Sequence, residues 1–417
     1  MVAQDRDRSP GVGIEDVRSP LDSLLGWGGD ALKRERAMIE LDPHDVAPVP
    51  SFTNARGLAG IALYSPSEHS GGNRHDQTSR EVLVARLAAL LRIPLIPEVE
   101  TTDDVGPDIL LVPRETIVDG PGETRLLSAT TLLGGRVPHP FVATKAITHG
   151  LISEDAARPE GWSNAMADRL GDAALNGYTA FTASDAVEAG LRLLETGPAR
   201  VKEVNGKASL GQTVVKTADE LRAVIAGHDP DELARIGVVI EENMSDVETY
   251  SVGSLTVAGL EISYVGDQQE TVDHKGRTVY GGTRLRCVRG GLDRLTHLGL
   301  ETEAIEAIRC AAVFDDAARR AYPSMVLTRR NYDVLAGRDA NERRRVGVLE
   351  QSWRVGGATG AEVAALEAFA YGPDLDFVNT ATVEVYGDAV IPTHAVTYFS
   401  GVDPVVGSMT KYAMELL

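Results

Sequence analysis

Cysteine and aromatic residues are scarce in this sequence of 417 residues. The two cysteines, Cys287 and Cys310, have no spacing that fits a metal site, so we expect buried, reduced thiols rather than a disulfide framework. Aromatic side chains make up only 5% of the chain. The core must therefore be built mainly from Ala, Val, Leu and Ile.

Long apolar runs and an excess of positive charge are also missing. No run approaches the roughly 18 apolar residues of a membrane-spanning helix, and the N-terminal MVAQDRDRSPG lacks the apolar centre of a secretory signal. Acidic residues outnumber basic ones by 61 to 41, and the net charge of -20 repels nucleic acid and anionic membranes. We therefore expect a cytoplasmic protein with small-molecule partners, without nucleic-acid or membrane partners.

The residues that are present indicate two folded parts after an N-terminal arm. Residues 1–50 mix Pro, Gly, Asp and Arg and predict a poorly ordered arm. Residues 51–136 hold an apolar strand at 60–66, a polar loop and a helix, which predicts a small open α/β domain. Ligands favour the carboxyl ends of strands in such domains, so the loop at 67–77 either faces a ligand or is simply solvated. Residues 137–417 form the second, larger domain.

The clearest motif is the stretch ARVKEVNGKASLGQTVV at residues 199–215. A β-rich run carries Lys202, a loop with Gly206, Ser209 and Gly211 follows, and a second β run returns. A lysine supplies a point charge to polyphosphate, and small residues let backbone N–H groups approach the oxygens. The stretch predicts a phosphate-binding hairpin, although a plain β-hairpin with a flexible turn has the same pattern.

Carboxylates stand on or near three later strands. The apolar strand GVVIEENM ends in Glu241 and Glu242, and Glu248 follows seven residues after Glu241. Asp333 and Glu350 lie in two further strand patterns, MVLTRRNYDVL and VGVLEQSWRVGG. Mg²⁺ favours hard oxygen ligands, usually one or two carboxylates with substrate phosphates, so Asp333 and Glu350 suit it. A carboxylate such as Glu248 can accept hydrogen bonds from two sugar hydroxyls.

In chain order these features resemble the ATP-grasp superfamily, in which two α+β subdomains hold ATP between them. The resemblance covers about residues 137–394 and implies an ATP-grasp fold of mixed α+β and α/β class, preceded by the small α/β domain. It implies that two lysines and a small-residue loop bind the phosphates of ATP. It also implies that the backbone at the end of the glutamate-bearing strand contacts adenine and that a carboxylate binds the ribose. The ATP-binding residues so implied are Lys145, Lys202, Ser209, Gly211, Glu241, Glu242, Asn243, Met244 and Glu248. The implied magnesium ligands are Asp333, Glu350 and, at the third ligand position, Ser352.

Two positions depart from the family pattern. The last metal strand usually reads Glu-x-Asn, whereas Ser352 here replaces the asparagine. The family commonly has an arginine two residues before the metal aspartate, and this sequence has Asn331. Because Ser352 replaces the asparagine, a second magnesium ion is in question. Because Asn331 replaces the arginine, the stabilisation of negative charge by that arginine is in question. Several segments also resemble a bacterial ATP-grasp group sometimes labelled biotin carboxylase-like, but the sequence holds no biotinyl-lysine domain.

These features predict an ATP- and Mg²⁺-dependent ligase that joins a carboxylate to an amine or another nucleophile through an acyl phosphate. Arg284, Arg286 and Arg354 are the candidates for holding the carboxylate or acyl phosphate, because a guanidinium group recognises such anions with two hydrogen bonds. A small-molecule kinase and a nucleotide-binding protein with weak catalysis are the alternatives. The substrates stay open, and a homodimer is expected only because dimers are the commonest oligomers.

Overall fold

The computed structural model describes residues 55–66, 73–120, 127–206 and 211–416. The predicted N-terminal arm and Ser209 lie outside the described residues. Val49–Leu417 belong to one compact unit, and the domain boundary expected after residue 136 stays a prediction. Among the described helices, none is long and apolar enough to cross a membrane.

A small parallel sheet begins the described fold. The strands β1 (Gly60–Tyr64) and β2 (Ile109–Pro113) pair in parallel, and every residue in both is buried. Parallel neighbours need a crossover connection, and α2 (Arg74–Leu91) lies within it. Apolar residues such as Leu83 and Leu87 recur about one turn apart on α2, so one stripe of the helix is buried. A β-α-β unit is thus present where the sequence predicts one.

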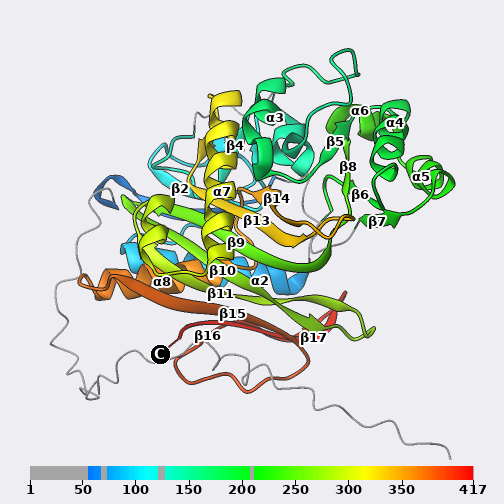
Figure 1. The fold of residues 1–417 in the computed structure, drawn as a ribbon. Coiled ribbons are helices and arrows are strands. Elements are labelled where there is room, and N and C mark those ends of the chain that lie inside the picture. The colour runs from blue at the N-terminus through cyan, green and yellow to red at the C-terminus, as the bar shows by residue number, and fades with distance from the viewer. Residues whose placement is uncertain (1–54, 67–72, 121–126, 207–210, 417) are drawn as a thin grey trace, which may run out of the picture. The chain divides into compact units, whose positions relative to one another are not determined.

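A four-stranded antiparallel sheet contains the predicted hairpin, in the order β5-β8-β6-β7. Its strands are β5 (Gly177–Ala180), β6 (Ala199–Glu203), β7 (Gln212–Val215) and β8 (Val238–Glu242), and its helices are α4 (Ala183–Leu194), α5 (Ala218–Ile225) and α6 (Pro230–Ile236). The start of α5 is fixed by a capping box in which Thr217 and Glu220 each accept from the other's backbone N–H. Figure 1 shows the three helices grouped around this sheet, in green.

An eight-stranded antiparallel sheet is the largest element of the fold, in the order β14-β13-β9-β10-β11-β15-β17-β16. Its strands are β9 (Ser245–Val257), β10 (Leu260–Val272), β11 (Thr278–Arg289), β13 (Arg329–Arg338), β14 (Arg344–Ser352), β15 (Phe377–Tyr386), β16 (Val396–Asp403) and β17 (Gly407–Glu415). Figure 1 shows the long helix α7 (Thr302–Ala321), in yellow, beside this sheet. Helix α7 shares a core with Val252 of β9, and α8 (Thr359–Tyr371) shares a second core with Leu255 of the same strand. Side chains alternate along a strand, so these two cores cover opposite faces of the sheet.

Short elements connect the sheets. They are η2 (Ala55–Gly57), η4 (Thr102–Asp104), β3 (Ile117–Val118), β4 (Gly135–Val137), η5 (Pro140–Ala143), η6 (Lys145–Thr148), α3 (Asn164–Leu170), η7 (Gly171–Ala173), η8 (Leu292–His297) and β12 (Val326–Leu327). The one-turn helix η6 touches β5 and β8 of the four-stranded sheet and also β14 of the eight-stranded sheet. The predicted class, mixed α+β and α/β, is confirmed, and η6 contacts both of the larger sheets.

Candidate active site

Lys202 lies on β6 in a buried ion pair. Its ammonium group contacts the carboxylate of Glu241 on the adjacent strand β8, and the two side chains are only 3% and 2% exposed. The other carboxylate oxygen of Glu241 lies 3.2 Å from Nε2 of His149, which follows η6. Burial by itself raises the pKa of Glu241, but Lys202 and His149 outweigh that effect and lower the pKa to about 2. Glu241 is therefore ionised at neutral pH and holds Lys202 at the end of its strand.

Lys145 lies on η6 and is also buried. Its Nζ atom is 2.5 Å from Oε2 of Glu350 on β14 and 3.0 Å from the carbonyl oxygen of Gly206, which follows β6. The hydroxyl of Thr144 caps η6 by accepting a backbone N–H bond at 3.2 Å. One lysine thus connects the loop after Lys202 with the strand that carries Glu350.

The predicted small-residue loop is described at its two ends. Gly211 has a φ of +70°, and a Cβ atom there would lie 2.6 Å from Oε2 of Glu203. Glycine is the residue that fits such a position without strain. Ser209, the other predicted phosphate contact in this loop, lies outside the described residues.

Asp333 and Glu350 are direct neighbours on β13 and β14, so their side chains share a face of the sheet. Oδ1 of Asp333 accepts hydrogen bonds from Gln268 at 2.9 Å and from Asn331 at 3.0 Å. Burial, and then the charge of Glu350, raise the pKa of Asp333 to about 6. Two carboxylates held this close repel each other, and a divalent cation would relieve that repulsion. The donor set therefore fits Mg²⁺.

Ser352, the third predicted metal ligand, lies two residues past Glu350 on β14 and so shares its face of the sheet. It lies opposite Asn331 on β13, and its Oγ atom is 3.4 Å from the guanidinium group of Arg329. In the part of the chain that the structure describes, no group of three or more His, Cys, Asp or Glu side chains could hold a metal ion. The chain thus offers two carboxylates, and Mg²⁺ would take its other ligands from substrate and water.

A small apolar cluster lies beside these carboxylates. Leu175, Met244 and Leu335 are buried together, and Leu349 packs on them. Leu335 is two residues past Asp333 and so lies on the same face of the sheet. Sequence reasoning named Met244 but missed the three leucines. The two-residue spacing from Asp333 was a usable signal for Leu335, whereas nothing in the sequence connects Leu175 to the site.

The strand end at Glu241 to Met244 is held from both sides. The backbone N–H of Asn176 donates to Oε1 of Glu242 at 2.9 Å, and the N–H of Glu242 donates back to the Asn176 carbonyl at 2.8 Å. Arg200 donates to Oδ1 of Asn243 at 2.8 Å. This segment therefore has a fixed backbone beside the apolar cluster.

Glu248 lies on β9 opposite Ala336 and is exposed. Ala336 is three residues past Asp333, so Glu248 points to the face opposite to Asp333. Its partner is the hydroxyl of Tyr250, which donates to Oε2 at 3.1 Å. Burial, and then Glu248, raise the pKa of Tyr250 to about 12. The structure thus does not bring Glu248 together with Asp333 and Glu350.

Arg284 and Arg286 also lie on the opposite face of the eight-stranded sheet. The residues directly across from one another on β13, β9, β10 and β11 are Asp333, Ser251, Gly266 and Leu285. Leu285 therefore shares the face of Asp333, and the arginines on either side of Leu285 point away from it. NH2 of Arg284 lies 2.7 Å from the carboxylate of Asp267, a neighbour on that other face.

The end of β14 is fixed by a buried ion pair that sequence reasoning missed. Arg329 and Glu362 are 2% and 0% exposed, and their side chains are 2.7 Å apart. NH1 of Arg329 also donates to the carbonyl oxygens of Ser352 at 3.1 Å and Arg354 at 2.7 Å. The Arg354 side chain itself lies 3.1 Å from Glu115. Arg354 thus sits on a rigid backbone four residues beyond Glu350.

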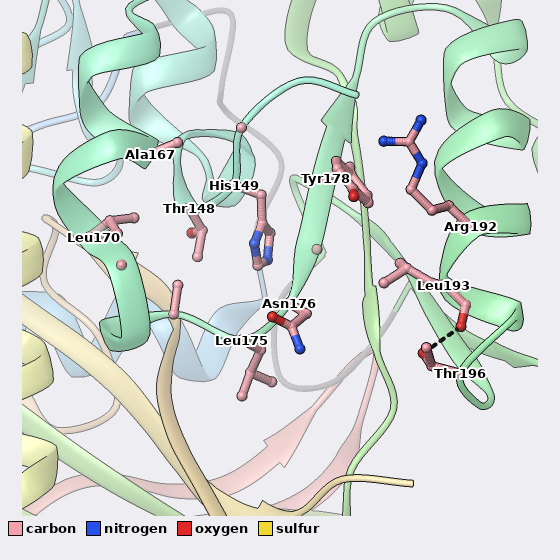
Figure 2. Close-up of a pocket in the computed structure, with 14 residues that line it drawn as sticks. Thr148, His149, Ala167, Leu170, Leu175, Asn176, Tyr178, Arg192, Leu193 and Thr196 are labelled. Carbon is pink, nitrogen blue, oxygen red and sulfur yellow. Dashed lines mark hydrogen bonds between the residues drawn. The ribbon is translucent and has the colours of Figure 1, made fainter. Parts of the chain in front are cut away.

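A cavity of about 390 Å³ adjoins the Lys202 pair. It lies beside α3, β5 and α4, and Figure 2 shows His149, Tyr178 and Arg192 among its lining residues. Thr148 also lines it, and its buried hydroxyl has no hydrogen-bond partner among the described residues. Because His149 contacts Glu241, this cavity is separated from the Lys202 pair by a single side chain.

The fold and the site define a mixed α/β protein in which two buried lysines, each paired with a carboxylate, lie where a four-stranded and an eight-stranded sheet meet. A family model described as "Protein of unknown function (DUF3182)" matches residues 63–413. This span is most of the chain, so the chain belongs to that family. No curated protein matches the sequence.

Several solved structures are similar to this chain at low identity. N5-carboxyaminoimidazole synthetase from Staphylococcus aureus, complexed with ADP, has a TM-score of 0.46 and 11% identity over 86% of this chain and 93% of that chain. Biotin carboxylase from Campylobacter jejuni has a TM-score of 0.44 and 10% identity over 86% and 87%. D-alanyl-alanine synthetase A from Vibrio cholerae has a TM-score of 0.39 and 12% identity over 71% and 89%. These are enzymes of the ATP-grasp class that the sequence resembles. At such TM-scores the likeness carries no argument about function, which depends on this chain's own side chains.

Proposed function

We propose that this protein is an ATP- and Mg²⁺-dependent ligase that joins a carboxylate to an amine or another nucleophile through an acyl phosphate. The observation that carries the proposal is the pairing of both predicted phosphate lysines, Lys202 with Glu241 and Lys145 with Glu350. The four residues come from four separate elements. Burying a lysine is costly even when it is paired, so two buried lysines in one place support a functional role for both.

In this proposal, ATP lies along the apolar cluster and the lysines. Adenine packs on Met244 and Leu335, and the fixed backbone of residues 241–244 forms hydrogen bonds with the polar edge of the base. The phosphates meet Lys145 and Lys202, whose ammonium groups form strong, charge-assisted hydrogen bonds to phosphate oxygens. The closeness of Lys145 to the loop after Lys202, through Gly206, supports a shared phosphate site.

Asp333 and Glu350 would hold Mg²⁺, with phosphate oxygens completing its ligands. The ion, when bound, offsets negative charge that grows on the phosphoryl group during transfer. The guanidinium group of Arg329 lies 3.4 Å from the Ser352 hydroxyl and competes with a metal ion for its oxygen, which supports one magnesium ion rather than two.

The chemistry has two steps. A carboxylate oxygen of the acceptor attacks the γ-phosphorus, the bond to the bridging oxygen breaks, and ADP leaves. The nucleophile then attacks the acyl carbon, loses a proton, and displaces inorganic phosphate. Lys145 and Lys202 stabilise the negative charge on the transferring group in the first step.

Isothermal titration of MgATP into the wild type and Lys202→Ala tests the proposal. We expect at least tenfold weaker binding by the variant, about 1.4 kcal/mol, because the variant lacks a charged phosphate contact. Lys216→Ala, which removes an exposed lysine nearby in the sequence, should bind as the wild type does. Equal affinities for the wild type and Lys202→Ala would overturn the proposal.

A nucleotide-binding protein with weak catalysis is the second candidate, because Arg329 engages the residue at the third ligand position. A screen of carboxylate and amine pairs for ATP hydrolysis separates the candidates. A ligase releases phosphate together with a new amide, a kinase leaves phosphate on the product, and a protein with weak catalysis shows neither above background.

A further inference from the structure

One oxygen of the Asp333 carboxylate is surrounded by side-chain donors. Its Oδ1 atom accepts hydrogen bonds from the amide nitrogens of Gln268 at 2.9 Å and Asn331 at 3.0 Å, and the Ser251 hydroxyl lies farther away, at 3.5 Å. Oδ2 has no hydrogen-bond partner among the described residues. A carboxylate oxygen has two lone pairs, so the two amides occupy Oδ1 and leave Oδ2 for a cation.

Gln268 reaches Asp333 from two strands away. Gln268 lies on β10 and Asp333 on β13, and β9 lies between these two strands (Figure 1). The amide of Gln268 also donates at 3.2 Å to Oγ of Ser251, which is the β9 residue directly opposite Asp333. Ser251 is buried and small, so it leaves room for the longer side chain to reach across β9 and fixes the amide on the way.

Asn331 is held by a second side chain from β10. The hydroxyl of Tyr264 lies 2.9 Å from Oδ1 of Asn331 and 2.6 Å from Oε1 of Glu362, so its proton is shared between two acceptors. With Oδ1 turned towards this hydroxyl, the amide nitrogen of Asn331 faces Asp333. Gly253 on β9 pairs with both Tyr264 and Asn331, and a Cβ atom there would clash with the Tyr264 hydroxyl. A glycine is therefore required for this contact.

These contacts limit what Asp333 can offer a metal ion. Ca²⁺ takes roughly six to eight oxygen ligands and often uses both oxygens of a carboxylate. Mg²⁺ is smaller, needs near-octahedral geometry and keeps several waters. A carboxylate with one oxygen already occupied therefore disfavours Ca²⁺ more than Mg²⁺. Both donors are neutral amides, so they orient the carboxylate without cancelling its charge.

We propose that Gln268 and Asn331 are positioning residues that make Asp333 a one-oxygen ligand, and that they thereby select Mg²⁺ over Ca²⁺. This inference rests on the proposed function for the metal site at Asp333 and Glu350. The two residues act through Oδ1 of Asp333 and do not touch the metal themselves. Their effect should therefore appear in the choice between two cations, which a general role in folding would not change.

The test is isothermal titration of MgATP, CaATP and metal-free ATP into the full-length wild type, Gln268→Met and Asn331→Ala. We expect the wild type to bind MgATP about tenfold or more tightly than CaATP. Gln268→Met keeps the side-chain length and loses the donor, so Oδ1 can join Oδ2 in binding Ca²⁺. The preference for MgATP should then fall by about threefold or more. Asn331→Ala should shift the preference in the same direction.

The matched control is Gln269→Met. Gln269 is the next residue on β10, so its side chain points to the other face of the sheet, where it contacts Asp267. This variant makes the same chemical change one position away and should keep the wild-type preference for MgATP. Both complexes are compared within one protein, so a loosened fold weakens both and leaves their ratio unchanged.

An unchanged preference in Gln268→Met would overturn the inference, and so would a fall in both affinities by the same factor. A wild type that binds MgATP and CaATP equally, and both more tightly than metal-free ATP, would also overturn it while leaving the metal site standing. If Asn331→Ala has a lowered melting temperature, Gln268→Met decides alone.

Failure of the proposed function would look different. A wild type that binds metal-free ATP as tightly as MgATP would show that Asp333 and Glu350 hold no metal. A wild type that binds ATP in none of the three forms would contradict the ligase proposal itself. Either result would overturn this inference together with the proposed function.

Discussion

At the scale of single residues, Glu241 is the centre of the site because it holds Lys202 and His149 at once. All three side chains are buried, so the charges are weakly screened and each depends on the others. Removing one partner of a buried ion pair lowers the free energy of unfolding by more than the pair itself contributes, because the remaining charge is left buried without compensation.

Glu241→Gln should therefore lower the free energy of unfolding by about 3–5 kcal/mol near neutral pH. The folded-state pKa of Glu241 is about 2, below its ordinary 4.5, so its ionised form stabilises the fold above pH 4.5. This stabilisation is lost as the pH falls from 4.5 towards 2. Urea unfolding at a series of pH values should show a difference between wild type and variant that is full near neutral pH and shrinks below pH 4.5.

The control for that experiment is Glu160→Gln, which changes an exposed glutamate. It should leave the free energy of unfolding almost unchanged at every pH. If the difference in the free energy of unfolding between the wild type and Glu241→Gln stays constant down to the acid range, Glu241 has an ordinary pKa in the folded protein. That result would contradict the pairing of Glu241 with Lys202 and His149.

The residues of this site were predictable from the sequence where chemistry and spacing agreed. Lys202, Glu241, Asp333 and Glu350 are polar residues in apolar strand patterns, and burial of such residues needs a reason. Arg329 and Glu362 could not be found in this way. They are 33 positions apart, and only the packing of α8 on the sheet brings them together.

At the scale of elements, η6 and β14 are joined by the Lys145–Glu350 pair. The ammonium group of Lys145 holds an oxygen of Glu350, which is one of the two carboxylates proposed to bind Mg²⁺. In the proposed function, phosphate attracts Lys145 and Mg²⁺ attracts Glu350, so the two ligands break the same pair. Each ligand should therefore favour binding of the other.

Lys145→Ala should have opposite effects on the two ligands. Without the lysine, Glu350 is free to bind a cation, so Mn²⁺ should bind the nucleotide-free variant more tightly than the wild type. ATP should bind the variant at least tenfold more weakly, about 1.4 kcal/mol, because one phosphate contact is lost. Electron paramagnetic resonance of free Mn²⁺ and calorimetry with ATP measure the two effects.

Lys216→Ala serves as the control, because this lysine is exposed. It should change neither affinity. If Lys145→Ala weakens Mn²⁺ and ATP binding together, Lys145 supports the shape of the site rather than competing with the metal.

Strand register explains what the sequence could not predict about the arginines. Alternation correctly places Arg284 and Arg286 on one face of β11. Which face that is depends on pairing through β10 and β9 to β13, and these strands are contributed by residues far apart in the chain. A pattern of period two within one strand holds no information about that pairing.

At the scale of the whole compact unit, the proposed nucleotide contacts come from two different sheets. The lysine hairpin and the strand end at 241–244 belong to the four-stranded sheet, and the carboxylates belong to the eight-stranded sheet. Glu242 on β8 lies 3.6 Å from Arg345 on β14, which joins the two sheets directly. Lys145 with Glu350, and the bridge of Ala174 to Val348, connect β14 to segments that lie just before β5 in the chain. A ligand that touches both sheets should therefore stabilise them together.

Hydrogen exchange with mass detection tests this coupling. MgATP should slow exchange both in peptides from residues 199–215 and 238–244 and in peptides from residues 329–352, by similar factors, because opening either sheet releases the same ligand. Peptides from α2, which has no proposed nucleotide contact, serve as the internal control and should change little. Lys202→Ala should lose the protection in both sheets at the same MgATP concentration. Protection confined to the four-stranded sheet would mean that nucleotide binds the hairpin without meeting Asp333 and Glu350, and the proposed magnesium site would then be wrong even though nucleotide binds.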